Sequence, residues 1–356
     1  ATVSFTAPTF TGVPPGVTQY RVTSDPGAIT ATGSASPITV TGLTNGTSYT
    51  FSVQATNGVQ FGPAGVSGSV TPEGLIALMS GGGVSGSGAV INKLLIATTG
   101  NATDFGDLTR NVTTTGSVGG ETRALMGGGN SSSDVTIDFV TFATEGNATD
   151  FGDLTTGRNE LAGAGNAIRG LFACGSNKNV IDYVTIATAG NAIDFGDRSI
   201  ATNDIGALSS SSRAVFGGSG NGLNIMDYVT IASTGNAIDF GDLTQGAQSP
   251  AGASSSTRGL FMALNTGTGT NVINYITIAS TGNAIDFGDA IQARGSGPAG
   301  ASSETRALLG GGYLSVSLNS VEFFTIASTG NGTDFGDLTV ASYRISGCSN
   351  AHGGLA

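Results

Sequence analysis

The sequence predicts an all-β protein built from two different modules. Short runs rich in Val, Ile, Thr and Phe alternate with Gly-rich turns, and no long stretch has the period of a helix. The segment Gly-Asn-x-x-Asp-Phe-Gly-Asp occurs six times, and its period of roughly 45 residues indicates a repeat array. The first 72 residues lack this segment. We therefore expect one module over residues 1–72 and a second over residues 73–356.

The first module shows the pattern of a small β-sandwich. Strand-like runs lie at residues 1–8, 18–25, 36–43, 48–57 and 65–72, with Pro, Gly and Asn turns between them. Residues 43–57 resemble the strand E–F region of a fibronectin type III domain. The resemblance implies that Tyr49 packs at the corner of the sandwich with its hydroxyl bonded to backbone, and that Tyr20 and Val22 lie on strand C.

Two positions depart from the fibronectin type III pattern. Phe5 stands where strand B usually carries Trp, and Ala1 already begins strand B. A sandwich without its first strand exposes an edge and part of its core. We therefore expect the polypeptide to extend upstream, or a neighbouring chain to supply that strand.

The repeat unit contains four strand-like pieces, which is the composition of one β-propeller blade. The first unit starts directly at its second strand, at residues 74–83, and the last unit is followed by residues 345–350, which match the missing first strand. Pairing these two pieces would close one blade with strands from both ends of the array. We predict a six-bladed β-propeller on this basis; a solenoid or an intertwined trimeric fibre is the structural alternative.

The repeats also resemble kelch repeats. A glycine cluster ends the second strand at residues 81–83, 127–129, 217–218 and 310–312, an aromatic residue follows on the third strand, and a Phe lies on the fourth. Kelch repeats have Trp at this last position, whereas the chain contains no Trp. The resemblance implies a kelch-like propeller with shorter units, and we expect the Phe of each repeated motif to be a core residue.

The acidic residues of the motif and a recurring Arg are predicted to be structural. The motif carries Asn and two Asp, which could hold Ca²⁺, but the spacing is not that of an EF-hand loop. We favour a structural role, in which Asn caps its own turn and the Asp carboxylates accept backbone N–H groups or pair with Arg between blades. The last Asp of each motif is Asp107, Asp153, Asp197, Asp242, Asp289 or Asp337. The recurring Arg is Arg123, Arg169, Arg213, Arg258 or Arg306, and Gly74 stands where the first unit is expected to have one.

The sequence argues against an enzyme. His352 is the only His, and Ser-His-Asp or Cys-His catalysis requires one in the site. The carboxylates are repeated identically, so none is distinguished as a general acid, and the Gly clusters lack the Lys of a phosphate-binding loop. Cys174 and Cys348 are expected to be free, structural thiols. We expect no catalytic residue, no bound metal and no cofactor.

Ligand binding is predicted for the loops in which the units differ. These loops follow the second strand at residues 83–90, 129–135, 175–180, 218–225, 264–272 and 312–321, and others follow the fourth strand, such as 155–162 and 243–251. An alternative is that the loops are only solvated connections. The candidate contact residues are Tyr313, Leu314, Asn177, Lys178, Asn221 and Asn265.

Charge and hydropathy exclude two kinds of partner. The formal net charge is −11, so nucleic acid is not expected to bind. Half of the 24 acidic residues belong to the repeated motif, so part of this charge is a by-product of the repeat. No apolar stretch approaches the roughly 20 residues that span a bilayer, so we expect no membrane insertion.

The whole chain resembles structural proteins of tailed bacteriophages, notably those of marine cyanobacteria. The resemblance depends on the fibronectin type III-like module followed by units such as residues 227–244, which read DYVTIASTGNAIDFGDLT. It implies a non-enzymatic virion protein of a tail fibre or appendage that binds other virion proteins or copies of itself and contacts host surface polysaccharide. The alternative is an extracellular bacterial adhesin or filament subunit built from the same modules.

Overall fold

The chain divides into two compact units, Ala1–Gly74 and Leu75–Ala356. The structure is a computed structural model that describes residues 1–8, 16–44, 47–70, 72, 74–83 and 88–355. Residues 84–87 of the first predicted loop lie outside the described residues. Within the described part, all regular elements are β-strands except one short 3₁₀ helix, η1 (Gly353–Leu355), and no helix is long and apolar enough to cross a bilayer.

The first unit contains a four-stranded and a two-stranded antiparallel sheet. The four-stranded sheet has the order β3 (Thr30–Gly33), β2 (Gln19–Asp25), β5 (Thr50–Thr56) and β6 (Gly65–Val66). In the second sheet, β1 (Thr2–Val3) pairs with β4 (Ile38–Thr39). Alternate residues of β2 are buried, as expected for a strand with one face on a core. That core is formed around Val22, Val40 and Phe51.

The predicted corner of the sandwich is present. Tyr49 is buried, and its hydroxyl oxygen accepts a hydrogen bond from the Thr44 N–H at 2.9 Å. Tyr20 and Val22 lie on β2 as predicted, and the Phe5 ring packs on Tyr20 with 4.7 Å between ring centroids. Phe5 therefore fills the core at the position where Trp is usual.

The second unit consists of six four-stranded antiparallel sheets and one small hairpin. Sheet 1 contains β32 (Ser346–Ser349), β7 (Ile76–Ser80), β8 (Val90–Leu95) and β9 (Thr103–Asp107). Sheet 2 contains β10 (Gly116–Gly119), β11 (Arg123–Gly127), β12 (Thr136–Thr141) and β13 (Thr149–Asp153). Sheet 3 contains β14 (Ala162–Gly165), β15 (Arg169–Ala173), β16 (Lys178–Thr185) and β17 (Ile193–Thr202). Sheet 4 contains β18 (Gly206–Ser209), β19 (Arg213–Gly217), β20 (Ile225–Thr230) and β21 (Ile238–Asp242). Sheet 5 contains β22 (Ala251–Ser254), β23 (Arg258–Met262), β24 (Thr270–Thr277) and β25 (Ile285–Arg294). Sheet 6 contains β26 (Ala299–Ser302), β27 (Arg306–Gly310), β30 (Ser320–Thr325) and β31 (Thr333–Asp337), and β28 (Tyr313–Leu314) pairs with β29 (Val316–Ser317) in the loop between β27 and β30.

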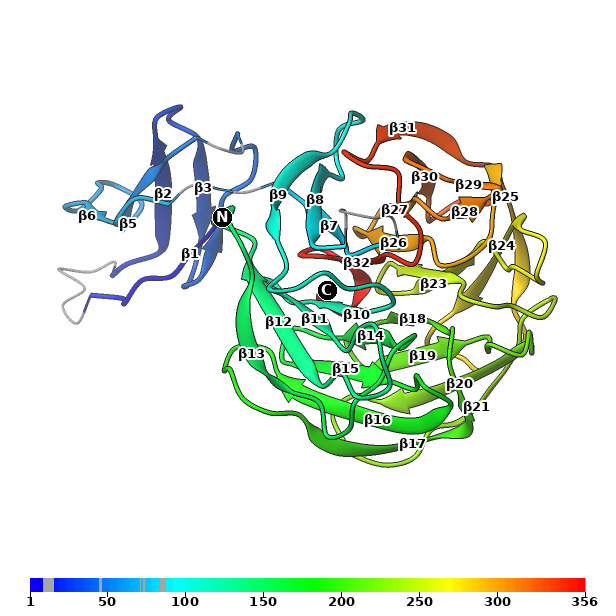
Figure 1. Cartoon of the computed structure of the whole chain (residues 1–356). Coiled ribbons are helices and arrows are strands. Elements are labelled where there is room, and N and C mark those ends of the chain that lie inside the picture. The colour runs from blue at the N-terminus through cyan, green and yellow to red at the C-terminus, as the bar shows by residue number, and fades with distance from the viewer. Residues whose placement is uncertain (9–15, 45–46, 71, 73, 84–87, 356) are drawn as a thin grey trace. The chain divides into compact units, whose positions relative to one another are not determined.

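The six sheets lie around a common centre (Figure 1). The first strands β10, β14, β18, β22, β26 and β32 contact one another in cyclic order, so they form the innermost layer. The strand expected at residues 345–350 is present, because β32 pairs antiparallel with β7, with Cys348 opposite Leu78. Sheet 1 therefore combines the two ends of the second unit.

The hydrophobic core of the second unit lies between neighbouring sheets. The second strand of each sheet is almost entirely buried, as in β11 and β15. One core cluster joins Leu125 and Phe151 of sheet 2 to Phe172 and Val184 of sheet 3. The Phe of every repeated motif is buried, and full burial of such a side chain stabilises the fold by about 1.5–3 kcal/mol. The motif Phe is therefore a core residue, as its repetition suggested.

The repeated motif joins each sheet to the preceding one by hydrogen bonds. At the junction of sheets 1 and 2, the Gly146 N–H donates to the Phe105 carbonyl at 2.8 Å, the Ala148 N–H donates to the Asp107 carbonyl at 2.7 Å, and the Asp107 N–H donates to Asn147 Oδ1 at 3.0 Å. The same Asn–Asp bond recurs at all six junctions, including the one from Asp337 back to Asn101. The prediction that Asn caps its own turn is wrong: its oxygen accepts from the preceding unit, about 40 residues earlier in the chain.

The Gly of Asp-Phe-Gly-Asp is required by this contact between sheets. Gly196 has φ +145°, and a Cβ built on it would lie 2.5 Å from the Gly235 carbonyl oxygen of the next motif. Gly235 itself has φ +156° with no atom within 4 Å of such a Cβ. The first glycine is therefore constrained by both conformation and space, and the second by conformation alone.

We expect Gly196→Ala to destabilise the second unit more than Gly235→Ala, by roughly 1–3 kcal/mol, because only the first substitution forces two backbones apart. Both variants carry the same strain from positive φ, so their difference isolates the contact. Urea unfolding of the full chain, followed by circular dichroism, would measure it. Equal losses of stability in the two variants would contradict the packing explanation.

Candidate functional site

The recurring Arg side chains do not pair with the Asp residues of the motif, and this prediction is wrong. Arg213 donates from Nη1 to the Ile278 carbonyl of sheet 5 at 3.0 Å, and its guanidinium lies over the Tyr228 ring at 4.6 Å. The other four Arg residues make equivalent contacts with a carbonyl of the next sheet and an aromatic ring of their own sheet. The motif Asp residues lie on the outermost strands, away from these positions. The Arg residues do join neighbouring sheets, but through carbonyl oxygens.

Sheet 1 joins sheet 2 with a different side chain. Strand register places Ile76, rather than Gly74, at the position of the recurring Arg, and Lys93 at the position of the aromatic residue. Lys93 Nζ pairs with Glu145 Oε1 of sheet 2 at 2.7 Å. An ion pair therefore replaces the Arg–aromatic pair at this junction.

Four other Arg residues form inter-sheet ion pairs that the sequence reasoning missed. Each lies one to five residues after the last Asp of a repeated motif, either within the fourth strand or just beyond it, and reaches an acid on the third strand of the next sheet. Arg198 Nε donates to Asp227 Oδ2 at 2.9 Å, and both side chains are buried. The remaining pairs are Arg110–Asp138, Arg158–Asp182 and Arg294–Glu322. Burial raises the pKa of the Asp138 carboxyl, with the Thr109 hydroxyl and Arg110 opposing the shift.

The two remaining junctions have Asn in place of the acid. Asn274 accepts hydrogen bonds from the Thr244 N–H and hydroxyl, and Gln245 occupies the region after the fourth strand where other units carry Arg. Asn92 accepts equivalent bonds from Thr339. A buried carboxylate without a cation is costly, so a neutral amide fits where no Arg is present. This substitution of Asn for acid was readable from the aligned repeats.

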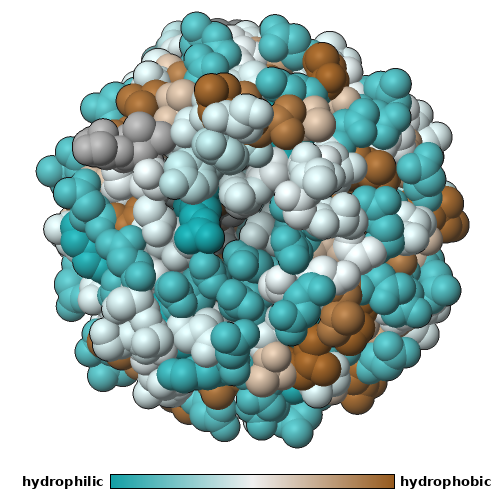
Figure 2. All heavy atoms as spheres, turned by 45° about the vertical axis from the view of Figure 1, so that its right-hand side comes forward, coloured by the Kyte–Doolittle hydropathy of each residue, from teal (hydrophilic) through white to brown (hydrophobic). Residues whose placement is uncertain are grey.

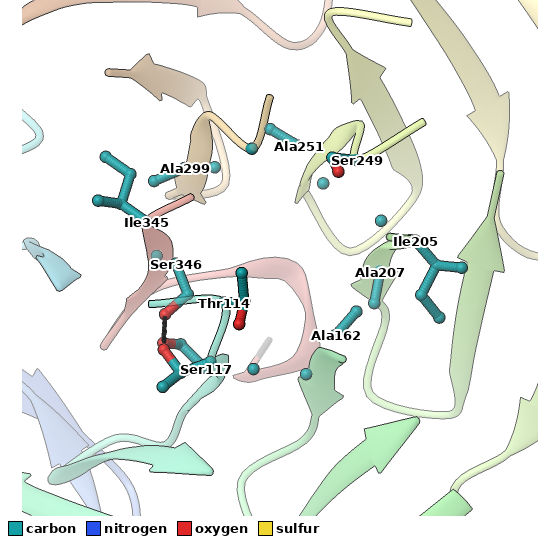
Figure 3. A pocket seen from close by; sticks show the side chains of 18 of the residues that line it. Thr114, Ser117, Ala162, Ile205, Ala207, Ser249, Ala251, Ala299, Ile345 and Ser346 are labelled. Atoms are coloured by element: carbon teal, nitrogen blue, oxygen red, sulfur yellow. Dashed lines mark hydrogen bonds between the residues drawn. The ribbon is translucent and has the colours of Figure 1, made fainter. Parts of the chain in front are cut away.

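A central cavity of about 100 Å³ lies among the starts of the six innermost strands. Figure 3 shows side chains from these strands around it, including Ser117, Ala207, Ala251, Ala299 and Ser346. Just before each innermost strand, one residue adopts a positive φ between 49° and 61°. We call these six residues the mouth ring: Thr114, Glu160, Asp204, Ser249, Gly297 and Arg344.

Backbone hydrogen bonds connect most of the mouth ring. The Thr114 N–H donates to the Arg344 carbonyl at 3.0 Å, the Glu160 N–H to Thr114 at 2.9 Å, the Asp204 N–H to Glu160 at 3.0 Å, and the Ser249 N–H to Asp204 at 2.8 Å. These bonds fix the backbone of equivalent positions in one conformation. The side chains, by contrast, are different at all six positions.

The mouth ring carries two carboxylates and one guanidinium. Glu160 Oε1 lies 3.5 Å from Arg344 Nη1, with Thr114 between them in ring order, and the Arg344 side chain is 43% exposed. The Ser249 hydroxyl donates to Asp204 Oδ1 at 2.7 Å, and Asn203 Nδ2 donates to both Glu160 and Asp204. Burial raises the pKa of the Asp204 carboxyl, the Ser249 hydrogen bond opposes this shift, the Glu160 charge adds to it and the Arg344 charge opposes it. Asp204 has no cationic partner within ion-pair distance among the described residues.

The opposite end of the innermost strands is occupied by residues 350–355. His352 Nδ1 accepts a hydrogen bond from the Gly354 N–H, so Nε2 carries the proton and donates to the Gly119 carbonyl at 2.8 Å. Ser209, Ser254, Ser302 and Ser349 form a chain of hydroxyl-to-carbonyl bonds between the other inner strands at this level. On β10 and β14, Gly119 and Gly165 stand at the position that Ser occupies on the other inner strands. Residues 350–355 pack against these two glycines.

The predicted ligand-contacting residues have different surroundings. Tyr313 and Leu314 form β28; Tyr313 is 40% exposed, and its ring lies 5.3 Å from that of Tyr343. Asn177 and Asn221 are exposed, whereas Lys178 Nζ donates to Thr156 and to the Gly157 carbonyl.

Asn265 is not available as a surface contact. It is buried, and its Oδ1 accepts from the Gly267 and Gly269 N–H groups, so it is a turn residue. Its prediction as a ligand contact is wrong for this reason, because its side-chain oxygen is already used to hold the loop.

Neither thiol is suited to nucleophilic chemistry. Cys174 and Cys348 are both buried and free. Burial raises the pKa of the Cys348 thiol to about 12 and also raises that of Cys174. No three His, Cys, Asp or Glu side chains come together as a metal site within the described ranges.

The comparison with known families agrees with the geometry of the first unit. Residues 1–70 match the family model of the fibronectin type III domain. The first unit is therefore a fibronectin type III domain. No curated protein matches the chain.

We expect Asp227→Asn to cost about 3–5 kcal/mol of unfolding free energy, because Arg198 is left buried without its charge partner. The double variant Arg198→Gln/Asp227→Asn copies the Gln245 and Asn274 pair and is expected to recover to within about 2 kcal/mol of the wild type. Denaturant unfolding of the three proteins would measure both values. A double variant as unstable as the single one would contradict the charge explanation.

The contribution of His352 to the stability of the second unit is expected to fall as the pH is lowered from about 7.5 to about 5. Burial lowers the pKa of His352, with the Gly119 carbonyl and the Glu304 charge opposing the shift. The unfolded chain therefore binds a proton more readily than the folded one, and acidification below the ordinary His pKa favours unfolding. Thermal unfolding across this range should show a smaller pH dependence for His352→Gln. An unchanged pH dependence would show that this imidazole has no such role.

Proposed function

We propose that the chain is a non-enzymatic recognition module in which the second unit is a six-bladed, kelch-like β-propeller that binds surface glycans through the face containing the mouth ring. Support for the architecture comes from six four-stranded sheets whose innermost strands contact one another in cyclic order. The pairing of β32 with β7 supports closure by strands from both ends of the array.

The mouth ring is the observation that carries this proposal. The Asp-Phe-Gly-Asp residues are the same in every unit and serve packing and hydrogen bonding between sheets. At the mouth ring the backbone is equally regular, but the six side chains are all different. Residues that differ in type but are held on a rigid, regular backbone are typical of a binding site.

The variable loops lie at the same end of the sheets as the mouth ring. Antiparallel register places Ala299, at the start of β26, opposite Gly310, at the end of β27, so the loop that follows β27 begins beside the cavity. The Gly312 N–H donates to the Ser342 carbonyl, close to Tyr343 and Arg344. The aromatic pair Tyr313–Tyr343 and the mouth ring therefore belong to one face.

Polar contacts are favoured over an apolar interface. Figure 2 shows apolar residues in small separate groups among hydrophilic ones on the face in view. The cavity is lined by small residues, chiefly Gly and Ala, with some Ile, Leu and Pro, and its polar lining residues are Thr114, Thr115, Ser117, Glu160, Asp204, Ser249, Arg344 and Ser346. Carboxylates, hydroxyls and a guanidinium suit the hydroxyl groups of a sugar, and exposed Tyr rings suit its apolar face.

Catalysis is disfavoured by the placement of the reactive groups. His352 is held at the end opposite the mouth ring, and the two thiols are buried with raised pKa values. We propose that the module belongs to a virion, as part of a tail fibre or appendage with copies of itself or other virion proteins as partners. An extracellular bacterial adhesin is the alternative setting for the same binding face.

Glycan binding can be tested with the full chain on an array of bacterial surface polysaccharides and oligosaccharides. We expect a defined set of glycans to bind, and Tyr313→Ala to weaken binding roughly fivefold or more through loss of a stacking contact. Ile238→Ala, which removes a side chain of similar exposure from the outer strand β21, is the control and should bind as the wild type does. No binding across the array, or equal loss in both variants, would refute the proposal.

A further inference from the structure

The mouth ring has an uneven charge distribution. Glu160 and Asp204 are adjacent in the ring and share one amide donor, Asn203 Nδ2. Arg344 forms an ion pair with Glu160, at 3.5 Å, and acts on Asp204 only at longer range. Two carboxylates and one guanidinium leave a local charge of about −1 at the cavity, in a protein whose formal net charge is −11.

Asp204 is the side chain that this distribution leaves uncompensated. Its carboxylate is partly buried and accepts hydrogen bonds from Ser249 and Asn203, but a carboxylate has further acceptor sites. Burial is the main cause of its raised pKa, and the Ser249 hydrogen bond and the Arg344 charge only oppose the shift. A positive group that entered the cavity would find Asp204 and Glu160 on one side of the ring.

The chemistry around the two carboxylates favours an ammonium group over a metal ion. Asn203 presents an N–H donor, not an oxygen, to both carboxylates, and Ca²⁺ needs six to eight oxygen ligands. Hydroxyl groups of Thr114, Ser249 and Ser346 lie around the same cavity. Thr114 donates to the Gly129 carbonyl, Ser249 donates to Asp204 and Ser346 bonds to Thr115 and Ser117, so a sugar hydroxyl would bond to them as a donor to their oxygens. The Tyr313–Tyr343 pair on the same face offers an apolar surface next to this polar cavity.

We propose that the mouth ring binds the end of a glycan through a sugar that carries a primary ammonium group. The ammonium donates to Asp204 and Glu160, and the sugar hydroxyls bond to the surrounding hydroxyl groups. Glu160 then exchanges its loose contact with Arg344 for the ligand. This inference rests on the proposed glycan-binding function and names its ligand class.

Titration of the full chain with monosaccharides, followed by ligand-observed NMR, tests the proposal. The probes are glucosamine, glucose, N-acetylglucosamine and ethylamine. We expect glucosamine to bind roughly five- to tenfold more tightly than each of the others, because only it combines the charge with the hydroxyls. Equal affinity for glucose or N-acetylglucosamine would overturn the role of the ammonium, and equal affinity for ethylamine would overturn the role of the sugar.

Two variants with opposite expected effects on glucosamine affinity distinguish a change in the binding site from a folding defect. Asp204→Asn should reduce glucosamine affinity to the level of glucose, whereas Arg344→Gln should raise it severalfold by removing the competing cation. Asp239→Asn neutralises an exposed carboxylate on the outer strand β21 of the same sheet and should change nothing. A loss of affinity in Arg344→Gln, or the same loss in Asp239→Asn as in Asp204→Asn, would overturn the assignment.

The glycan array separates this inference from the function on which it rests. Binding of glycans without amino groups that is lost in Tyr313→Ala and retained in Asp204→Asn would support glycan recognition and refute the ammonium site. Glucosamine binding that depends on Asp204, without any polysaccharide binding, would refute the adhesive function and support the ammonium site.

Discussion

The second unit depends on hydrogen bonds between neighbouring sheets. These bonds form three sets, at an outer, a middle and an inner radius from the common centre. At the outside, each motif Asn accepts from the Asp of the preceding sheet. At the middle radius, Arg or Thr residues that follow the motif of one sheet donate to an acid or Asn on the next sheet. At the inside, Ser hydroxyls donate to carbonyls of the neighbouring strand. Each sheet therefore satisfies part of its polar backbone only through its neighbours, and a sheet in isolation would leave these groups without partners.

This constraint explains why the composition is so unusual. Close approach of adjacent backbones at the outer and inner radii leaves no room for a Cβ at several positions, and the chain contains 59 Gly. The middle radius is the only one that buries charge, and there every described Arg side chain that is buried has an acid beside it. Residues that are the same in every repeat therefore lie where all six junctions between sheets have the same geometry. The mouth ring lies outside these three layers, so its side chains are free to differ.

Sequence patterns predicted the contacts whose residues stand at the same position in every repeat. The motif Phe and the return of residues 345–350 to the first sheet followed from the aligned repeats, and the Tyr49 corner followed from the resemblance to a fibronectin type III domain. The partners of the polar residues did not follow. Motif Asn and Asp sit close in sequence, but the oxygen of Asn bonds to the motif of another sheet. Arg110, Arg158, Arg198 and Arg294 were missed because they stand at different distances after the motif, so no column of the aligned repeats contains them all. The mouth ring was missed because its members share a backbone conformation and no side-chain type.

The pairing of β32 with β7 has a consequence for the order in which the protein forms. Strand β7 is fully buried in the finished unit, yet its partner lies about 270 residues later in the chain. During synthesis, the edge of β7 therefore stays unpaired until β32 has been made. This pairing closes a far longer loop than the pairings within the other sheets, and until it forms the apolar strand β7 has an open edge. The same bond network that holds the finished ring together thus makes the unfinished chain most vulnerable at its first repeat.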